Sequence, residues 1–202
     1  MAITDNFDRA DGAPGANWVE VYLTAGKASA GIVSNQFRSN QSFTYSHWRR
    51  TEATFPDDQY AQTSSKFDAV GFIGGQAFGR VSNDGDGYLA GGRWTTTISV
   101  LDRIDNGTTT SYLTEASRVH VTGTYYTIKV QAVGSTITAF EGGTEIMSAT
   151  DSTYTSGKPG IFTYDSGGSA NEAACDDFEC TDASGGAAAV IPGSNLLFMG
   201  VG

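Results

Sequence analysis

Residues 125–147 read YYTIKVQAVGSTITAFEGGTEIM, and this stretch decides the fold class. Apolar and polar side chains alternate strictly at its start, as they do in a half-buried strand. The two faces of this strand are Tyr126, Ile128, Val130, Ala132 and Tyr125, Thr127, Lys129, Gln131. Gly134-Ser135 and Gly142-Gly143 then supply two tight turns. The stretch therefore predicts three consecutive antiparallel strands.

Turn-forming residues also divide the rest of the chain into short segments. It holds 26 Gly but only six Leu among 202 residues, so turn formers are abundant and strong helix formers are scarce. Short runs rich in β-branched and aromatic residues bring the predicted strands to about a dozen. These runs are residues 17–22, 48–55, 59–67, 69–73, 78–82, 87–97, 98–104, 118–122, 160–164 and 175–180. We expect an all-β domain of two stacked antiparallel sheets.

The domain organisation follows from a change in composition near Asp182. Residues 1–182 carry the strand pattern, whereas residues 183–202 begin with a Gly/Ala-rich linker and end in an apolar tail. Four consecutive apolar residues form the centre of this tail: Leu196, Leu197, Phe198 and Met199. Two interpretations stay open, a last strand docked on its own domain or a segment that inserts into a partner.

Charge and cysteine usage exclude several classes of partner. Lys and Arg number 12 against 22 Asp and Glu, a net charge of -10, so nucleic acid is not expected as a partner. The acidity suits solubility or metal binding. No apolar run reaches the length of a membrane helix. Cys175 and Cys180 are too far apart along one strand for a disulfide, so both are predicted to be reduced.

Four segments carry a resemblance to a known family. They are Asp5-Asn-Phe-Asp-Arg-Ala-Asp-Gly12 followed by Trp18, residues 126–140, residues 150–161 and Asp176-Asp-Phe178. Together they resemble the concanavalin A-like lectin/glucanase jelly rolls of the laminin-G-like kind, over residues 5–180. The resemblance implies a two-sheet antiparallel β-sandwich whose first and last strands lie side by side, with Phe7 and Phe178 in the core.

Catalytic residues are hard to assemble from this sequence. The glucanase branch of the family uses a pattern like Glu-x-Asp-x-Glu on one strand, and none of the seven Glu residues lies in such a pattern. Glu141 and Glu145, across a Gly-Gly turn, are the remaining pair. His120, Tyr125 and Arg118 are the least implausible set for a lyase. We therefore predict that the protein is not an enzyme.

A turn rich in oxygen ligands is the first candidate metal site. Asn83, Asp84 and Asp86 offer three side-chain oxygens in five residues, which suits a hard cation such as calcium. Asn and Asp beside Gly are also what a tight hairpin requires. Both interpretations stay open, and calcium is the one candidate cofactor.

A second acidic group would form if the terminal strands pair. It consists of Asp5, Asp8, Asp176 and Asp177. The family resemblance implies that modules of this kind often hold calcium at a sheet edge.

Aromatic residues beside arginines are the candidate glycan-binding positions. Trp48 precedes Arg49-Arg50, and Trp94 follows Arg93 a few residues after Tyr88. A ring flanked by guanidinium groups suits a glycan pocket, and a tryptophan of the core is the alternative. The candidate glycan-binding set is Trp48, Tyr88, Arg93 and Trp94.

A jelly roll followed by a Gly/Ala linker and an apolar tail resembles components of phage virions and other surface assemblies. We therefore expect a non-enzymatic structural or decorating module of a virion or surface assembly, with weak glycan binding on its concave sheet. The tail would anchor it to other structural proteins in an oligomer or larger assembly. The alternatives are a free-standing carbohydrate-binding lectin and a polysaccharide-active hydrolase or lyase. Residues 1–9 show no secretory signal, so we expect synthesis in a cytoplasm before assembly.

Overall fold

The computed structural model describes residues 2–41, 44–52, 54–66, 76–93, 95–107, 109–165 and 174–183. Fifteen strands lie in these ranges, and all of their pairings are antiparallel. Within these ranges no helix is long and apolar enough to cross a membrane. The predicted all-β architecture is confirmed.

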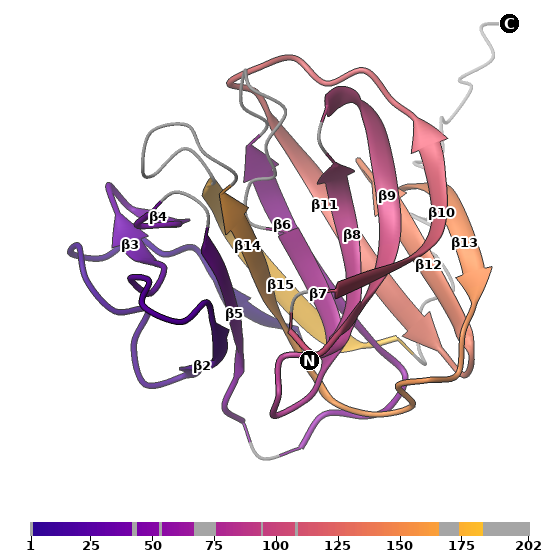
Figure 1. Ribbon diagram of the computed structural model, residues 1–202, viewed down its shortest axis with the longest axis horizontal. Coiled ribbons are helices and arrows are strands. Elements are labelled where there is room, and N and C mark those ends of the chain that lie inside the picture. The colour runs from indigo at the N-terminus through magenta and orange to yellow at the C-terminus, as the bar shows by residue number, and fades with distance from the viewer. Residues whose placement is uncertain are drawn as a thin grey trace, which may run out of the picture.

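The strands form two stacked sheets, and β7, β8 and β14 cross in front of β6, β11 and β15 in Figure 1. Sheet A runs β13 (Thr144–Thr150), β12 (Thr136–Glu141), β11 (Tyr125–Val133), β6 (Gln59–Lys66), β15 (Ala174–Asp182), β4 (Gln36–Arg38), β3 (Gly31–Val33), with β1 (Ile3–Asp5) beside β15. Sheet B runs β10 (Thr109–Ser117), β9 (Thr95–Asp105), β8 (Gly87–Arg93), β7 (Gln76–Val81), β14 (Lys158–Asp165), β5 (Thr44–Arg50), β2 (Trp18–Leu23).

The three-strand meander predicted from residues 125–147 is present as β11, β12 and β13. Gly134, Gly142 and Gly143 have φ of 55°, 56° and 80°, a conformation that costs glycine little. Ile128, Val130 and Ala132 are buried, as the alternation predicts. This meander supplies one end of sheet A.

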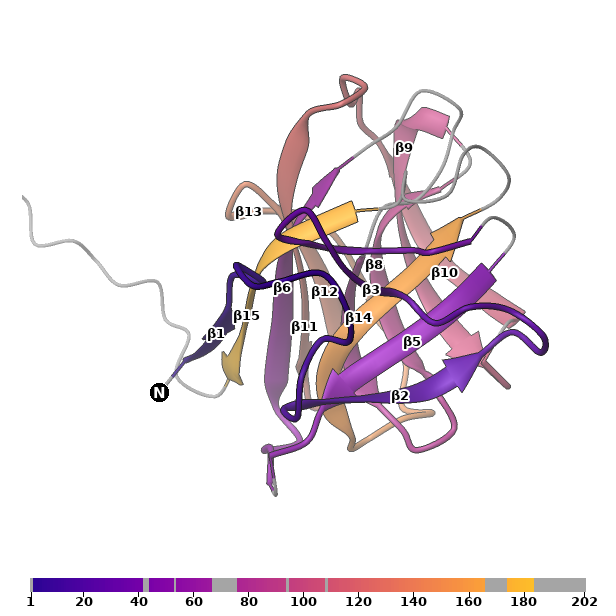
Figure 2. The ribbon, with the colours of Figure 1, turned by 90° about the vertical axis from the view of Figure 1, so that its left-hand side faces the viewer.

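The first and last strands lie side by side, as expected from the resemblance (Figure 2). Phe7 and Phe178 are both buried, and Trp18 packs between them with ring centroids at 5.8 Å and 4.8 Å. Asp5 accepts a hydrogen bond from Trp18 Nε1 at 2.8 Å and another from the Phe7 backbone N–H at 2.9 Å. The ends of the domain are therefore closed by backbone pairing, aromatic packing and one buried carboxylate.

Both cysteines are buried and unpaired, as predicted from their spacing. Burial raises the pKa of the Cys175 thiol and raises that of Cys180 to about 12. Both side chains therefore act as small core residues rather than as nucleophiles.

Several strands differ from the sequence-based expectation. Residues 118–122 were expected to be a strand, but β10 ends at Ser117 and these residues form the loop that follows it. The short hairpin of β3 and β4 was not expected. Its turn uses Ser34 and Asn35 with φ of 52° and 59°, whereas the usual signal for such a turn is a glycine.

A polar network ties sheet B to the segment before β14. Arg103 donates to Asp105 at 2.9 Å and to Asp151 at 2.7 Å. Tyr88 donates to Asp151 at 2.6 Å, and Tyr154 donates to Asp105 at 2.8 Å. Burial alone would raise the pKa of Asp151, but the hydrogen bonds from Tyr88, Thr153 and Arg103 outweigh it and hold that pKa at about 2.

We expect Asp151→Asn to lower the free energy of unfolding by about 2 kcal/mol at pH 7, because it removes charge-assisted hydrogen bonds. Since the folded-state pKa is depressed, the contribution of Asp151 is present above about pH 4 and is lost as the pH falls through about 2. Urea unfolding at pH 7 and pH 2.5 measures both values. Asp84→Asn, which changes an exposed carboxylate, is the control and should have no such effect. An equal difference between wild type and Asp151→Asn at the two pH values would contradict this assignment.

Candidate functional site

Sheet B buries apolar side chains on both of its faces. Ala77, Tyr88, Leu101 and Ile161 face sheet A and belong to the main core. Side chains of the opposite parity form a second cluster on the outer face of sheet B. This outer cluster consists of Phe78, Val81, Leu89, Ile104 and Phe162, with Val21, Tyr45 and Tyr164 packed against it.

A row of side chains crosses the outer face of sheet B. The register places Tyr22 opposite His47, His47 opposite Phe162, and Phe162 opposite Gln76. The His47 ring centroid lies 5.0 Å from that of Tyr22 and 4.5 Å from that of Phe162. Three aromatic rings and one amide thus lie in one cross-strand row.

His47 is a buried, neutral histidine. Its Nδ1 lies 2.9 Å from the Gly85 carbonyl oxygen, so Nδ1 carries the proton and Nε2 is an acceptor. Burial lowers the pKa of His47 to about 3. The Nε2 atom is buried and has no hydrogen-bond partner among the described residues. His47 therefore adds no positive charge to this face at neutral pH.

Gln76 and Gly91 interlock near the centre of the same face. A Cβ atom on Gly91 would lie 2.4 Å from Gln76 Cδ and Oε1, so the glutamine side chain occupies the space that a side chain on β8 would take. Gln76 Nε2 donates to the Gly92 carbonyl at 3.0 Å. Gln76 Oε1 is buried and accepts no hydrogen bond from the part of the chain that the structure describes. The geometry thus leaves one oriented acceptor at the centre of sheet B.

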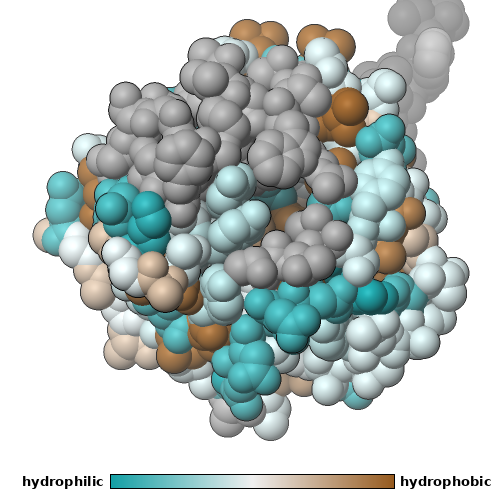
Figure 3. Space-filling view, viewed as in Figure 1, coloured by the Kyte–Doolittle hydropathy of each residue, from teal (hydrophilic) through white to brown (hydrophobic). Residues whose placement is uncertain are grey.

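Tyr45 and Tyr164 form the accessible part of the outer cluster. Their rings stack with centroids 4.2 Å apart and planes at 23°, and both side chains are half-buried. Figure 3 views the molecule in the orientation of Figure 1, and its brown side chains are scattered rather than gathered into one patch. The stacked tyrosines are therefore one accessible aromatic surface of this face, and Tyr112, which is 46% exposed and lies opposite Asp102, is another.

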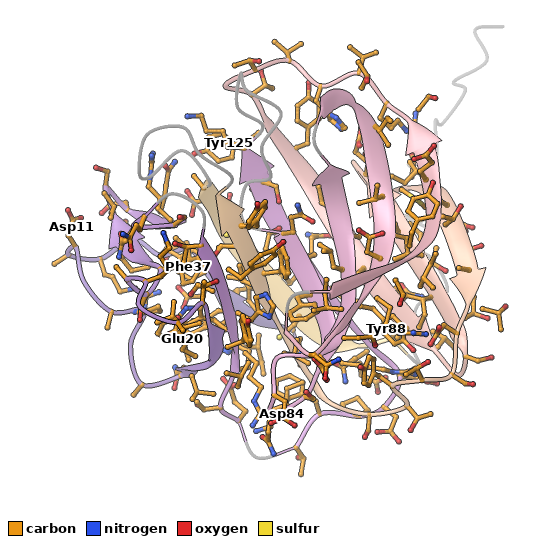
Figure 4. All side chains as sticks on the ribbon, in the orientation of Figure 1. Asp11, Glu20, Phe37, Asp84, Tyr88 and Tyr125 are labelled. Carbon is orange, nitrogen blue, oxygen red and sulfur yellow. The ribbon has the colours of Figure 1, made fainter. Side chains whose placement is uncertain are left out.

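Trp48 and Tyr88 do not line a glycan site, and this corrects the sequence-based prediction. Trp48 is 8% exposed in the core, where its Nε1 donates to Ser46 Oγ at 2.8 Å. Tyr88 has no exposed area, and Figure 4 shows it within the sandwich. An enclosed ring cannot stack on a sugar.

The other predicted glycan and anchoring residues are not described in enough detail to be placed. Arg93 ends β8, but only its backbone is described, and Trp94 lies outside the described residues. Residues 184–202 also lie outside the described residues. This range includes the predicted anchoring residues Leu196, Leu197, Phe198 and Met199. Their proposed roles stay predictions.

The turn of Asn83, Asp84 and Asp86 uses its oxygens for structure. Asn83 Oδ1 accepts a hydrogen bond from Arg49, and Asp86 Oδ1 accepts one from the Gly107 backbone N–H at 2.9 Å. Asp84 points outward at the lower edge of the view in Figure 4. In the described ranges no group of three or more His, Cys, Asp or Glu side chains could hold a metal. These contacts fit the hairpin interpretation, and calcium at this turn stays a prediction.

Of the residues named as catalytic alternatives, the structure shows the contacts of His120, Glu141 and Glu145. His120 Nε2 lies 2.9 Å from Glu141 Oε2, and Ser99 Oγ approaches that same nitrogen at 3.5 Å. A nucleophile relay needs the serine and the carboxylate on different ring nitrogens, so this is not a catalytic triad. Glu145 lies opposite Phe140 rather than opposite Glu141.

The residues that build the outer face of sheet B were missed at the sequence level. The segment Thr44–Arg50 alternates, with Tyr45, His47 and Arg49 on the outer face and Trp48 on the inner one. That alternation could have predicted which of these side chains lie on the outer face. The sequence could not predict the contact between Gln76 and Gly91, because that contact depends on which strands are neighbours in the sheet.

No protein-family model and no curated protein matches the chain. Several solved structures do match the chain in fold. The carbohydrate-binding module CBM66 from Bacillus subtilis is 19% identical, with a TM-score of 0.57 over 82% of this chain and 92% of that one. The apo Crh5 transglycosylase is 13% identical, with a TM-score of 0.59 over 90% of this chain and 84% of the other.

The exoplasmic/lumenal domain of VIP36, in its Ca2+/Man2-bound form, is 10% identical, with a TM-score of 0.59 over 90% and 87% of the two chains. At these identities the likeness shows the fold alone, which is the concanavalin A-like jelly roll. The fold-level expectation is confirmed, and the function has to be argued from the site.

We expect Gly91→Ala to lower the free energy of unfolding by about 1–3 kcal/mol, because the added methyl group displaces the buried Gln76 side chain. The double variant Gly91→Ala with Gln76→Ala should recover part of that loss, since the methyl group then enters the vacated space. Urea unfolding of the two single variants and the double variant gives the coupling energy. Strictly additive losses would show that the two positions do not interlock.

Proposed function

We propose that this chain is a carbohydrate-binding module whose glycan lies on the outer face of sheet B and is not cleaved there. The observation that carries the proposal is the stacked pair Tyr45 and Tyr164, half-buried beside the outer cluster. Flat, partly exposed aromatic rings suit the C–H faces of a pyranose. Gln76 Oε1 and His47 Nε2 are buried beneath this surface, so they belong to the packing of the face and not to its ligand contacts.

The chemistry of the same face argues against hydrolysis. Its central strands β7, β8 and β14 present Gln76, Phe78, Leu89 and Phe162, none of which is an acid. Retaining hydrolysis needs two carboxyl groups about 5 Å apart. Asp102 of β9 lies opposite Leu89 and is buried. Glu115 is opposite Val100 rather than Asp102. We therefore propose a binding role rather than a catalytic one.

The fold supports this proposal at a coarser level. CBM66 is by name a carbohydrate-binding module, and the VIP36 structure holds a mannose ligand. Crh5 is a transglycosylase on the same fold, so the fold is compatible with both binding and catalysis. The choice between them rests on the residues of sheet B.

A glycan array probed with the full chain tests the proposal. We expect binding to at least one glycan, and we expect Tyr164→Ala to reduce it tenfold or more, because the stacking face is lost. Tyr125→Ala is the matched control, since Tyr125 is a half-buried tyrosine on sheet A. Its binding should equal that of wild type. New reducing ends or unsaturated products from a bound polysaccharide would contradict the non-enzymatic role.

We also propose that the module belongs to a larger assembly, on a virion or another surface structure, and is attached through its tail. The sequence supports this, because Leu196, Leu197, Phe198 and Met199 follow a Gly/Ala-rich linker, and an apolar peptide of this kind needs a covering surface.

Size-exclusion chromatography of the full chain and of a chain ending at Asp182 tests the attachment. We expect the full chain to elute as an oligomer and the shortened chain as a folded monomer, with β15 intact at its end. Identical elution of both would count against attachment through the tail.

A further inference from the structure

A separate pocket lies where β1, β6 and β15 meet, with a volume of about 780 Å³. It is lined by residues of the first nine positions, by Asn17, by Gln62 of β6 and by Asp177–Glu179 of β15. Volumes of roughly 300–1,000 Å³ are usual for small-molecule sites. None of the residues that line it belongs to sheet B.

The pocket is built by a bulge in β15. The register of β15 against β6 shifts between Asp176 and Glu179, where three steps on β15 match two on β6. Asp177 has a φ of 48° at this bulge. Phe178 is consequently buried in the core, while the Asp177 side chain is exposed at the pocket. Bulges of this kind re-aim a side chain.

Some polar groups of the pocket form a fixed frame. Asp5 is held by Arg9, Trp18 and the Phe7 backbone N–H. Arg9 also donates to the Pro14 carbonyl at 3.0 Å, and Glu179 accepts a hydrogen bond from Tyr60. These groups are already satisfied, so they shape the pocket without needing a ligand.

Five other polar side chains of the pocket make no hydrogen bond or ion pair with any part of the chain that the structure describes. They are Thr4, Asp8, Asn17, Gln62 and Asp177. The set holds one hydroxyl, two amides and two carboxylates, so it offers acceptors and donors together. A ligand that carries many hydroxyl groups matches such a set.

The charge of the pocket narrows the ligand class. Four carboxylates, Asp5, Asp8, Asp177 and Glu179, face one guanidinium, that of Arg9. Burial and the neighbouring carboxylates Asp177, Asp8 and Asp5 raise the pKa of Asp176, which adjoins the pocket. An anionic ligand would meet the same repulsion. Asp5, Asp8 and Asp177, three members of the acidic group expected from the sequence, line this pocket. In the described residues no group of three or more His, Cys, Asp or Glu side chains could hold a metal.

We infer that this pocket is a second sugar-binding site, selective for neutral glycans over uronic acids or sulfated glycans. The ligand class rests on the proposed function, whereas the site itself rests on the pocket and its free polar groups. It lies on sheet A, away from the tyrosines of sheet B, so one chain can hold two glycan strands at once. Linked binding of this kind raises the apparent affinity for a polysaccharide surface.

Isothermal titration of the full chain with maltotriose, mannotriose, a neutral fructose trisaccharide and trigalacturonate tests the inference. We expect at least one neutral trisaccharide to bind at two sites and trigalacturonate to bind at neither. Gln62→Ala and Asp177→Asn should each reduce the stoichiometry from two to one. Gln131→Ala, an amide on β11 outside the pocket, should leave it at two.

The variants also separate this inference from the proposed function. If Tyr164→Ala removes one site and Gln62→Ala removes the other, the proposed sheet B site and the proposed pocket site are both supported. If Tyr164→Ala changes nothing while Gln62→Ala weakens binding tenfold or more, the pocket stands and the sheet B site falls. If Tyr164→Ala removes all binding and Gln62→Ala none, the pocket is not a sugar site. Preferential binding of trigalacturonate, or no binding by any neutral trisaccharide, would overturn the inference as well.

Discussion

The pairing of β1 with β15 joins the two ends of the domain, and the rest of the architecture depends on it. Backbone hydrogen bonds bring Asp5 opposite Phe178, which carries Phe7 and Phe178 into one aromatic cluster with Trp18. Asp5 is the polar centre of this junction, because its carboxylate receives the Trp18 indole, the Phe7 backbone N–H and Arg9. The same junction creates the pocket beside the β15 bulge.

Sheet B carries the other functional consequence of the fold. A sheet in a sandwich normally buries one face and leaves the other to solvent, but here Phe78, Leu89 and Phe162 are buried on the outer face as well. Burial keeps His47 neutral and leaves acceptors on His47 and Gln76 unsatisfied among the described residues. An unsatisfied buried acceptor costs roughly 1–3 kcal/mol.

Local pattern predicted the fold well and the site poorly. The alternation of residues 125–133 and the glycines that follow were sufficient for the β11–β13 meander, whereas the β1–β15 pairing was expected from the family resemblance that the terminal motifs carry. For Trp48 the core alternative is the one observed, and the sequence could not decide it because a tryptophan beside arginines looks the same in a core as in a glycan site. Gln76 gave no signal, since its role comes from Gly91 on a neighbouring strand, and the pocket beside Gln62 depends on a bulge in β15. Those contacts are non-local, and sequence spacing does not encode them.

A crystal structure of the full chain soaked with a neutral trisaccharide tests the central claim most directly. The account predicts sugar density against the Tyr45 and Tyr164 rings on sheet B. It also predicts density in the pocket within hydrogen-bond distance of Gln62 and Asp177. Sugar bound elsewhere on the molecule, with both of these surfaces empty, would contradict it.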